Sequence, residues 1–210
     1  MQITAGRPKD LEKRARILAA AKCMFLKQGY HGSSMNQIAS EAGVTKLTVY
    51  NHFQDKATLF TCAIEESCEE AIPARQFSLH AQSHFAKELY QVCSRVLHLI
   101  YLPEALKLEY ILLQLAAEQS PLVEQFFKAS HQRLTNSLTD FFRQAIELSF
   151  IQPAAPVMYT ELLLSLLLGI RHQHVLLGMQ PVPDQQERDC MIQQSIELFL
   201  LRYQVRSSPP

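Results

Sequence analysis

The stretch SSMNQIASEAGVTKLTVYNHFQDKATLF, residues 33–60, contains two helix starts separated by one glycine turn. Ser34 and Gln37 have the S-x-x-Q spacing of a capping box, so a short helix is expected to begin there. Gly43 tolerates the left-handed backbone that ends such a helix, and Thr45 has the side chain to cap the next one. The stretch therefore predicts two short helices joined by a tight turn, the second over residues 45–53.

A longer helix precedes this stretch. It is expected to begin near Asp10, because an apolar stripe with helical spacing follows, and Gly29 should end it. Tyr30 then falls where it can pack back on Phe25. Three helices with a tight turn between the second and third form the helix-turn-helix plan, in which the last helix enters the DNA major groove. The stripe consists of Ile17, Leu18, Ala21, Met24 and Phe25.

The predicted third helix has one buried and one exposed side. Val49 and Phe53 are four residues apart and should face the other two helices. Leu47, Tyr50, Asn51 and Gln54 should then point outward. Exposed leucine and tyrosine side chains on so short a helix indicate a surface that binds something.

Charge is unevenly distributed along the chain, although its formal sum is zero. Residues 1–60 carry nine lysines and arginines against four acidic residues, which leaves the remainder with a net charge of −5. A basic front segment is typical of a surface that faces a polyanion, although charge alone is equally compatible with an uneven solvated surface.

These residues resemble the N-terminal DNA-binding domain of the tetracycline-repressor (TetR) family of bacterial transcription regulators. The resemblance covers residues 6–60 and rests on four motifs: A-x-x-x-F-x-x-x-G-Y at 21–30, I-A-x-x-A-G-V at 38–44, V-Y-x-H-F at 49–53 and D-K-x-x-L-F at 55–60. Leu47 departs from the small residue that the family usually places there, so its base preference cannot be transferred. The resemblance implies a homodimer that reads palindromic double-stranded DNA and responds to a small effector.

The predicted DNA-contacting residues divide by chemistry. Lys46 suits guanine or phosphate, Thr45 and Thr48 can donate to phosphate or base, and Asn51 suits an adenine edge. Leu47 could meet a thymine methyl group or pack along its own helix. His52 could hold the DNA backbone or pack internally, and Arg7 and Lys9 could form a minor-groove arm or a disordered basic tail. The full predicted set is Ser34, Thr45, Lys46, Leu47, Thr48, Tyr50, Asn51, His52 and Lys56, with Tyr50, His52 and Lys56 on the DNA backbone.

The rest of the chain also has helical periodicity, and strand signals are nearly absent. The expected fold is all-α, with a helix-turn-helix domain and basic arm over residues 1–55 and an effector-binding and dimerisation domain over residues 56–210. Proline positions divide the second domain. The expected helices cover residues 55–72, 86–101, a segment from Pro103, one long helix from Ser120 to about 150, then 157–178 and 184–205, with residues 74–85 unassigned.

The last two expected helices carry more apolar surface than one chain's core needs. Residues 162–170 are apolar all round except Ser165 and Gly169, a pattern typical of a helix buried on several sides. We expect these helices to pair with their copies in a four-helix isologous interface, the alternative being a larger monomer core. The predicted interface residues are Leu163, Leu166, Leu167, Ile170, Ile192, Ile196, Phe199 and Tyr203.

The middle helices are expected to hold a small apolar or aromatic effector, as the resemblance implies. Candidates are polar or aromatic side chains on otherwise apolar faces. A protein partner in place of a small ligand remains the alternative for this domain. The candidate set is His98, Tyr101, Tyr110, Gln114, Phe127, His131 and His172.

Other functional classes find little support in the sequence. No nucleophile–base grouping, carboxylate pair or phosphate loop is present, so we do not expect an enzyme or a cofactor. His172 and His174 lie on different sides of a helix, and the five cysteines form no C-x-x-C pair, so no metal site is expected, although a redox-sensing thiol is a minor alternative. No apolar run approaches the roughly 20 residues of a membrane span, and no signal peptide is evident. We expect a soluble cytoplasmic protein.

Overall fold

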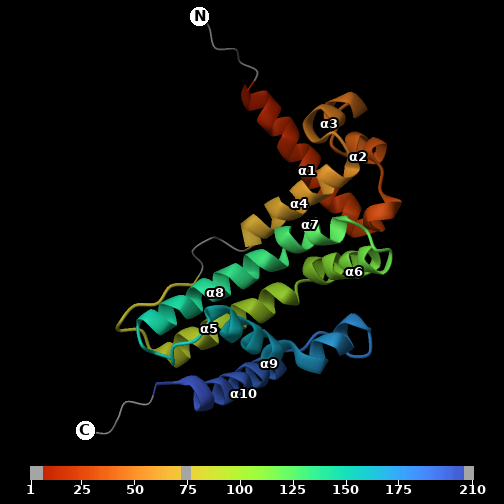
Figure 1. Cartoon of the computed structure of the whole chain (residues 1–210). Helices are drawn as coiled ribbons and strands as arrows, with labels where there is room; N and C mark the ends of the chain where they lie inside the picture. The colour runs from red at the N-terminus through yellow and green to blue at the C-terminus, as the bar shows by residue number, and fades with distance from the viewer. Residues whose placement is uncertain (1–6, 72–76, 206–210) are drawn as a thin grey trace, which may run out of the picture. The chain divides into compact units, whose positions relative to one another are not determined.

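The computed structural model describes residues 7–71 and 77–205 and confirms the all-α prediction. Over these ranges the chain forms ten helices and no strand (Figure 1). An isolated bridge between Ile151 and Gln204 ties the start of the loop before α9 to the end of α10. The helices are α1 (Arg7–Gly32), α2 (Met35–Glu41), α3 (Lys46–Phe53), α4 (Lys56–Ala71), α5 (Phe85–Ile100), α6 (Pro103–Ala117), α7 (Leu122–Ala129), α8 (His131–Glu147), α9 (Pro156–Leu176) and α10 (Gln185–Tyr203).

The caps of the helix-turn-helix agree with the sequence prediction. The N–H of Gln37 donates to Ser34 Oγ at 3.3 Å, and the N–H of Thr48 donates to Thr45 Oγ1 at 3.2 Å. Gly43 has φ +63°, and the N–H groups of Gly43 and Val44 bond the carbonyls of Ser40 and Ala39. This is the paired bonding of a Schellman motif, which turns the chain sharply from α2 into α3.

Helix α1 begins earlier than predicted. Its backbone is helical from Arg7, so Arg7 and Lys9 belong to the helix and not to an arm. Residues 1–6, which complete the predicted arm, lie outside the described residues, as do residues 72–76 within the unassigned segment and the serine–proline end of the chain. Gly29 interrupts α1 at φ +73°, and the rings of Phe25 and Tyr30 stack at 6.1 Å as predicted.

The described residues form two compact units that do not follow the chain in simple order. Unit 1 contains the described residues up to Ala71 together with Lys107–His131, which are most of α6 and all of α7. Unit 2 contains residues 77–106 and 132–205. Helices α6 and α8 therefore supply residues to both units.

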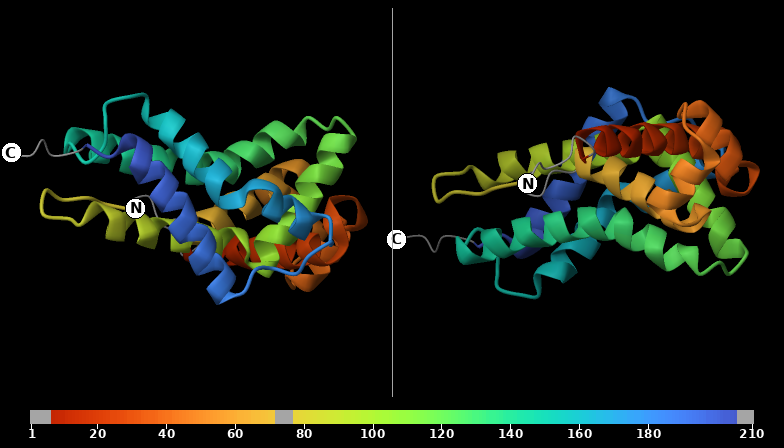
Figure 2. Two further views of the ribbon diagram at one scale, coloured as in Figure 1. Left: turned by 90° about the horizontal axis from the view of Figure 1, so that it is seen from below. Right: turned by 90° about the horizontal axis from the view of Figure 1, so that it is seen from above.

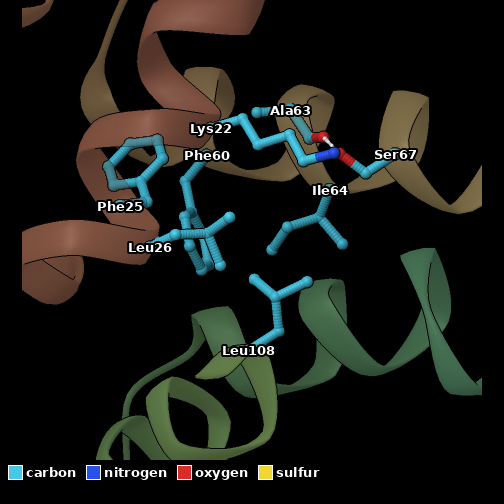
Figure 3. A pocket seen from close by; sticks show the side chains of 8 residues that line it. All are labelled: Lys22, Phe25, Leu26, Phe60, Ala63, Ile64, Ser67 and Leu108. Carbon is cyan, nitrogen blue, oxygen red and sulfur yellow. Dashed lines mark hydrogen bonds between the residues drawn. The ribbon is translucent and has the colours of Figure 1, made fainter. Parts of the chain in front are cut away.

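The core of unit 1 joins the three N-terminal helices to α4, α6 and α7. Phe60 of α4 lies 4.9 Å from Phe25 of α1 and 5.7 Å from Phe126 of α7, measured between ring centroids. A cavity of only ≈ 10 Å³ remains beside Phe25, Phe60, Ile64 and Leu108 (Figure 3). Because this volume is at the lower limit for one water molecule, the cavity is a small packing gap and not an effector site.

Unit 2 packs α10 against both α5 and α9, and α9 and α10 run beside one another in Figure 1 and in the left view of Figure 2. Two features of this half differ from the sequence prediction. The expected long helix from Ser120 breaks at Ser130, whose hydroxyl donates to the carbonyl of Phe126 at 2.8 Å. Helix α9 is interrupted at Gly169, with φ +43° and ψ −148°, a conformation that only glycine adopts without strain.

Candidate nucleic-acid interface

Helix α3 presents the surface that its periodicity predicts. Val49 and Phe53 are buried in the core of unit 1, while Leu47 is 69% exposed. Tyr50 is 39% exposed, and Asn51 lies on the same outward side. The buried pair fixes the rotation of the helix about its axis, and this determines which side chains face outward.

A shallow, open hollow lies beside this surface, with a volume of ≈ 240 Å³. Lys46 from α3 and the start of α2 contribute to it, and the Lys46 ammonium stands 5.6 Å from the centre of the Tyr50 ring. This cation–π contact holds a positive charge beside a hydroxyl donor, a pairing suited to a phosphate oxygen. The lining residues are Ser33, Ser34, Met35, Asn36, Lys46, Tyr50 and Lys56.

The two threonines of the predicted set are partly committed to the fold. Thr45 caps α3, and its hydroxyl lies 2.8 Å from that of Thr48. Thr45 remains exposed and Thr48 is half-buried. This contact uses one of the two hydroxyl protons, so the other hydroxyl can still donate to a phosphate oxygen.

His52 has an internal contact. Its Nε2 lies 3.3 Å from Oδ1 of Asp10 in α1, and its side chain is only 13% exposed. The contact links the last turn of α3 to α1. The structure thus places His52 where the packing alternative puts it.

Lys56 is held by the protein backbone. Its Nζ donates to the carbonyls of Tyr30 at 2.9 Å and Ser33 at 3.1 Å, and it stands 4.4 Å from the centre of the Tyr30 ring. Partial burial lowers the pKa of this ammonium from its ordinary value. The predicted phosphate partner is therefore engaged in joining α4 to the α1–α2 turn.

The seven candidate effector residues are divided between the two units. Three belong to unit 2: Tyr101 and His172 have rings 5.6 Å apart, while His98 is exposed. The other four belong to unit 1, where Phe127 stacks on His131 at 5.1 Å and Gln114 bonds Glu118. His131 also contacts Glu109 at 3.0 Å, and Tyr110 is 45% exposed.

The eight predicted interface residues fall into two sets. Leu163, Leu167, Ile192, Ile196 and Phe199 are buried within the core of unit 2 in the single chain. The physical reason is that α10 packs against both α5 and α9. Leu166 and Tyr203 are half-buried, and Ile170 is 68% exposed.

Some polar contacts were not foreseen from the sequence. Arg171 in α9 forms a two-point ion pair with Glu187 in α10, with Nε 2.6 Å from Oε1 and Nη2 3.2 Å from Oε2. A separation of 16 residues between two helices leaves no periodic signal. The Lys46–Tyr50 contact, by contrast, has the i, i+4 spacing that could have revealed it.

Helical length and hydropathy bear on membrane insertion. None of the helices in the described part of the chain is both long and apolar enough to cross a bilayer.

Comparison with known families gives two matches along the chain. Residues 17–61 match the model described as bacterial regulatory proteins of the tetR family. Residues 87–205, more than half of the chain, match the model of the C-terminal domain of AefR-like transcriptional repressors.

Individual relatives agree with these models. The regulator UidR of Escherichia coli K12 is 27% identical over 160 residues, which are 75% of this chain and 79% of that protein. The activator FasR of Mycolicibacterium smegmatis is 35% identical over 65 residues, or 31% of this chain and 29% of FasR. The repressor BepR of Brucella suis is 43% identical over 53 residues, or 25% of each chain.

Solved structures extend the similarity to nearly the whole chain. A TetR-family regulator from Mesorhizobium loti has a TM-score of 0.84 at 26% identity, covering 93% of this chain and 98% of that one. The flavonoid-responsive regulator FrrA shares the fold at a TM-score of 0.78 and 24% identity, covering 97% and 100%. The chain therefore belongs to the TetR family of helix-turn-helix transcriptional regulators.

Proposed function

We propose that this regulator is a repressor that binds a palindromic operator as a homodimer and is released by a small apolar or aromatic effector. The observation that carries the proposal is the outward face of α3, where Leu47, Tyr50 and Asn51 are exposed while Val49 and Phe53 anchor the helix. A helix held in this way can enter the major groove without rearranging its own core.

The polar side chains of this face have complementary tasks. Asn51 has the two-point amide that pairs with an adenine edge, and Lys46 donates to guanine or to a phosphate. Leu47 offers only apolar surface, which suits the methyl group of thymine. The positive charge of the N-terminal segment adds attraction to any DNA sequence, and this part of the affinity falls with salt.

Dimerisation is proposed through the exposed apolar side chains of α9 and α10. Ile170, Leu198 and Leu201 are 68%, 57% and 72% exposed in one chain. Burying them against a second copy removes apolar surface from water and produces a two-fold axis. A two-fold dimer presents two α3 helices to half-sites about 34–36 Å apart, one turn of B-DNA.

Release by an effector requires only modest coupling between the two binding events. A coupling free energy of about 1–3 kcal/mol changes operator affinity by roughly 5–150-fold. Because the linkage is reciprocal, operator DNA must weaken effector binding by the same factor. BepR is named a repressor and FasR an activator, so the direction of regulation has to be measured for this chain.

The test is an electrophoretic shift with DNA from immediately upstream of the protein's own gene, with and without a panel of apolar and aromatic compounds. The panel includes a flavonoid, because one protein of the same fold is titled flavonoid-responsive. We expect a shift that at least one compound abolishes. A shift that no compound changes, but that a bound protein changes, would favour a protein partner. The absence of any specific shift with the wild-type protein would refute the proposal.

A further inference from the structure

A polar cluster lies inside unit 2, where α5 ends beside α9 and the start of α10. Tyr101, at the C-terminal end of α5, is only 6% exposed. Arg171 follows the break in α9, and its side chain is 18% exposed. Its guanidinium bonds Glu187 at two points and donates through Nη2 to the carbonyl of Pro181 at 2.8 Å. These bonds use three of its five N–H groups, one on Nε and two on Nη2.

Two buried atoms of the cluster have no hydrogen-bond partner among the described residues. These are Tyr101 Oη and Arg171 Nη1. Buried polar groups in native proteins nearly always have partners, because an unmet donor loses its bonds to water without replacement. Nη1 can only donate and Oη can donate, so the missing partner is a hydrogen-bond acceptor.

The two groups act on each other electrostatically. Burial raises the pKa of the Tyr101 phenol, the Arg171 charge opposes this rise, and the Glu187 carboxylate adds to it. The phenol is therefore protonated near neutral pH and available as a donor.

Gly169 determines where this donor pair is placed. Its backbone at φ +43° and ψ −148° interrupts α9 two residues before Arg171, so the residues after it project differently from those of a straight helix. The ring of His172, the next residue, meets the ring of Tyr101 edge-on at 5.6 Å and 60°. The break thus precedes the two residues of α9 that belong to the cluster, Arg171 and His172.

We propose that Tyr101 Oη and Arg171 Nη1 bind the carbonyl oxygen of a neutral aromatic compound. The inference rests on the proposed function, because it names the chemical class of the effector. Glu187 already neutralises Arg171, so a carboxylate ligand would bring an uncompensated negative charge into the interior.

The chain offers a matched pair of tyrosine variants. Tyr101→Phe removes the hydroxyl that has no partner, whereas Tyr90→Phe removes one that donates to Asp189 at 2.8 Å. Both tyrosines connect α5 to a neighbouring helix of unit 2: Tyr90 contacts Asp189 of α10, and Tyr101 contacts His172 of α9. Without ligand, we expect Tyr101→Phe to leave the melting temperature unchanged or higher and Tyr90→Phe to lower it. Arg171→Lys is the second test variant. It keeps a positive charge for Glu187 but loses the planar guanidinium and its Nη1 donor.

The probes are two ketones and their hydrocarbon counterparts: 9-fluorenone with fluorene, and benzophenone with diphenylmethane. Fluorene-9-carboxylate is the anionic member. We expect at least one ketone to bind the wild-type protein more tightly than its hydrocarbon, by calorimetry or thermal shift. Tyr101→Phe and Arg171→Lys should remove this advantage, about tenfold for one lost hydrogen bond, and Tyr90→Phe should keep it.

Each other outcome overturns the inference. These are no ketone advantage in the wild type, a preference for the carboxylate, or an equal loss in Tyr90→Phe. Operator binding, measured on the same preparations, separates the two proposals. If DNA binds specifically while the ketones show no advantage, only this inference fails; if the ketone effect is present without specific DNA binding, the proposed function fails.

Discussion

Lys56 Nζ donates a hydrogen bond to the backbone carbonyl of Tyr30 at 2.9 Å and stands 4.4 Å from the centre of the same residue's ring. The first residue of α4 is thereby tied to the end of α1. The Lys56 ammonium therefore supplies a donor to the carbonyls of Tyr30 and Ser33, which follow the break at Gly29.

The first prediction concerns this contact. Lys56→Met should lower the free energy of unfolding by about 1 kcal/mol, because carbonyls lose a charged donor that is only partly shielded from water. Urea unfolding followed by circular dichroism measures the change. Lys46→Met is the matched control, since Lys46 is exposed and should leave stability unchanged.

The same two variants separate phosphate binding from positioning. Lys46→Met should reduce the slope of log affinity against log salt by about 1, whereas Lys56→Met should weaken binding to all sequences with an unchanged slope. If Lys56→Met also reduces the slope of log affinity against log salt, Lys56 binds a phosphate.

A second prediction follows from the cap of α4. The N–H of Thr58 donates to Asp55 Oδ1 at 2.7 Å, and this bond holds the pKa of Asp55 below its ordinary value of 3.8. Because the folded-state pKa is the lower one, the carboxylate contributes stability above pH 3.8 that is lost as the pH falls through the folded-state pKa. Asp55→Ala should therefore cost about 1 kcal/mol at pH 7, and much less below the folded-state pKa.

Asp55→Asn is the control for that prediction, because an asparagine side chain still caps a helix but does not titrate. Thermal unfolding over a pH series measures both variants. A difference between Asp55→Ala and wild type that stays constant down to the acid limit would contradict the assigned cap.

The third prediction tests the outward face of α3. Asn51→Ala should cost about 1–3 kcal/mol in operator binding and relax preference at one base pair, because only the amide reads that edge. Asn136→Ala makes the same chemical change at an exposed position of α8 and should leave binding unaltered. Binding to a library of single-base operator variants measures both effects. Unchanged base preference in Asn51→Ala would remove Asn51 from the reading surface.

A fourth prediction concerns the subunit interface. Leu198→Glu combined with Leu201→Glu should yield a chain of monomer mass by light scattering, since two charges would have to be buried without partners. Leu11→Glu, at a 62% exposed position of α1, should leave the mass of the dimer unchanged. If the double variant keeps the mass of a dimer, α10 is not in the interface. A monomer in the wild-type protein at micromolar concentration would exclude the interface entirely.

The helix-turn-helix could be predicted from the sequence because its signals are local. Ser34 and Thr45 cap helices that begin one residue later, and Gly43 turns the chain with the positive φ that its residue type permits. Two anchors four residues apart, Val49 and Phe53, were enough to fix which side of α3 is exposed. Each signal lies within a few residues of the structure it determines.

The second half was less predictable because its pattern is degenerate. When a helix is apolar nearly all round, its sequence does not show which side faces the core. The inward Leu163 and the outward Ile170 therefore look alike in sequence. At the break, the carbonyl of Phe126 accepts from both the N–H and the hydroxyl of Ser130, and serine forms such bonds inside many helices without ending them. Lys56 and Arg171 find their partners through tertiary structure, which no short spacing encodes.

The discontinuous makeup of unit 1 has a consequence for protein engineering. A fragment ending at Ala71 would keep the DNA-reading helices but leave Phe60 without Phe126 and strip the other partners that α6 and α7 supply to α4. A graft of this reader onto another regulator would therefore need to carry residues 107–131 along with the N-terminal segment, or find matching side chains in its new host.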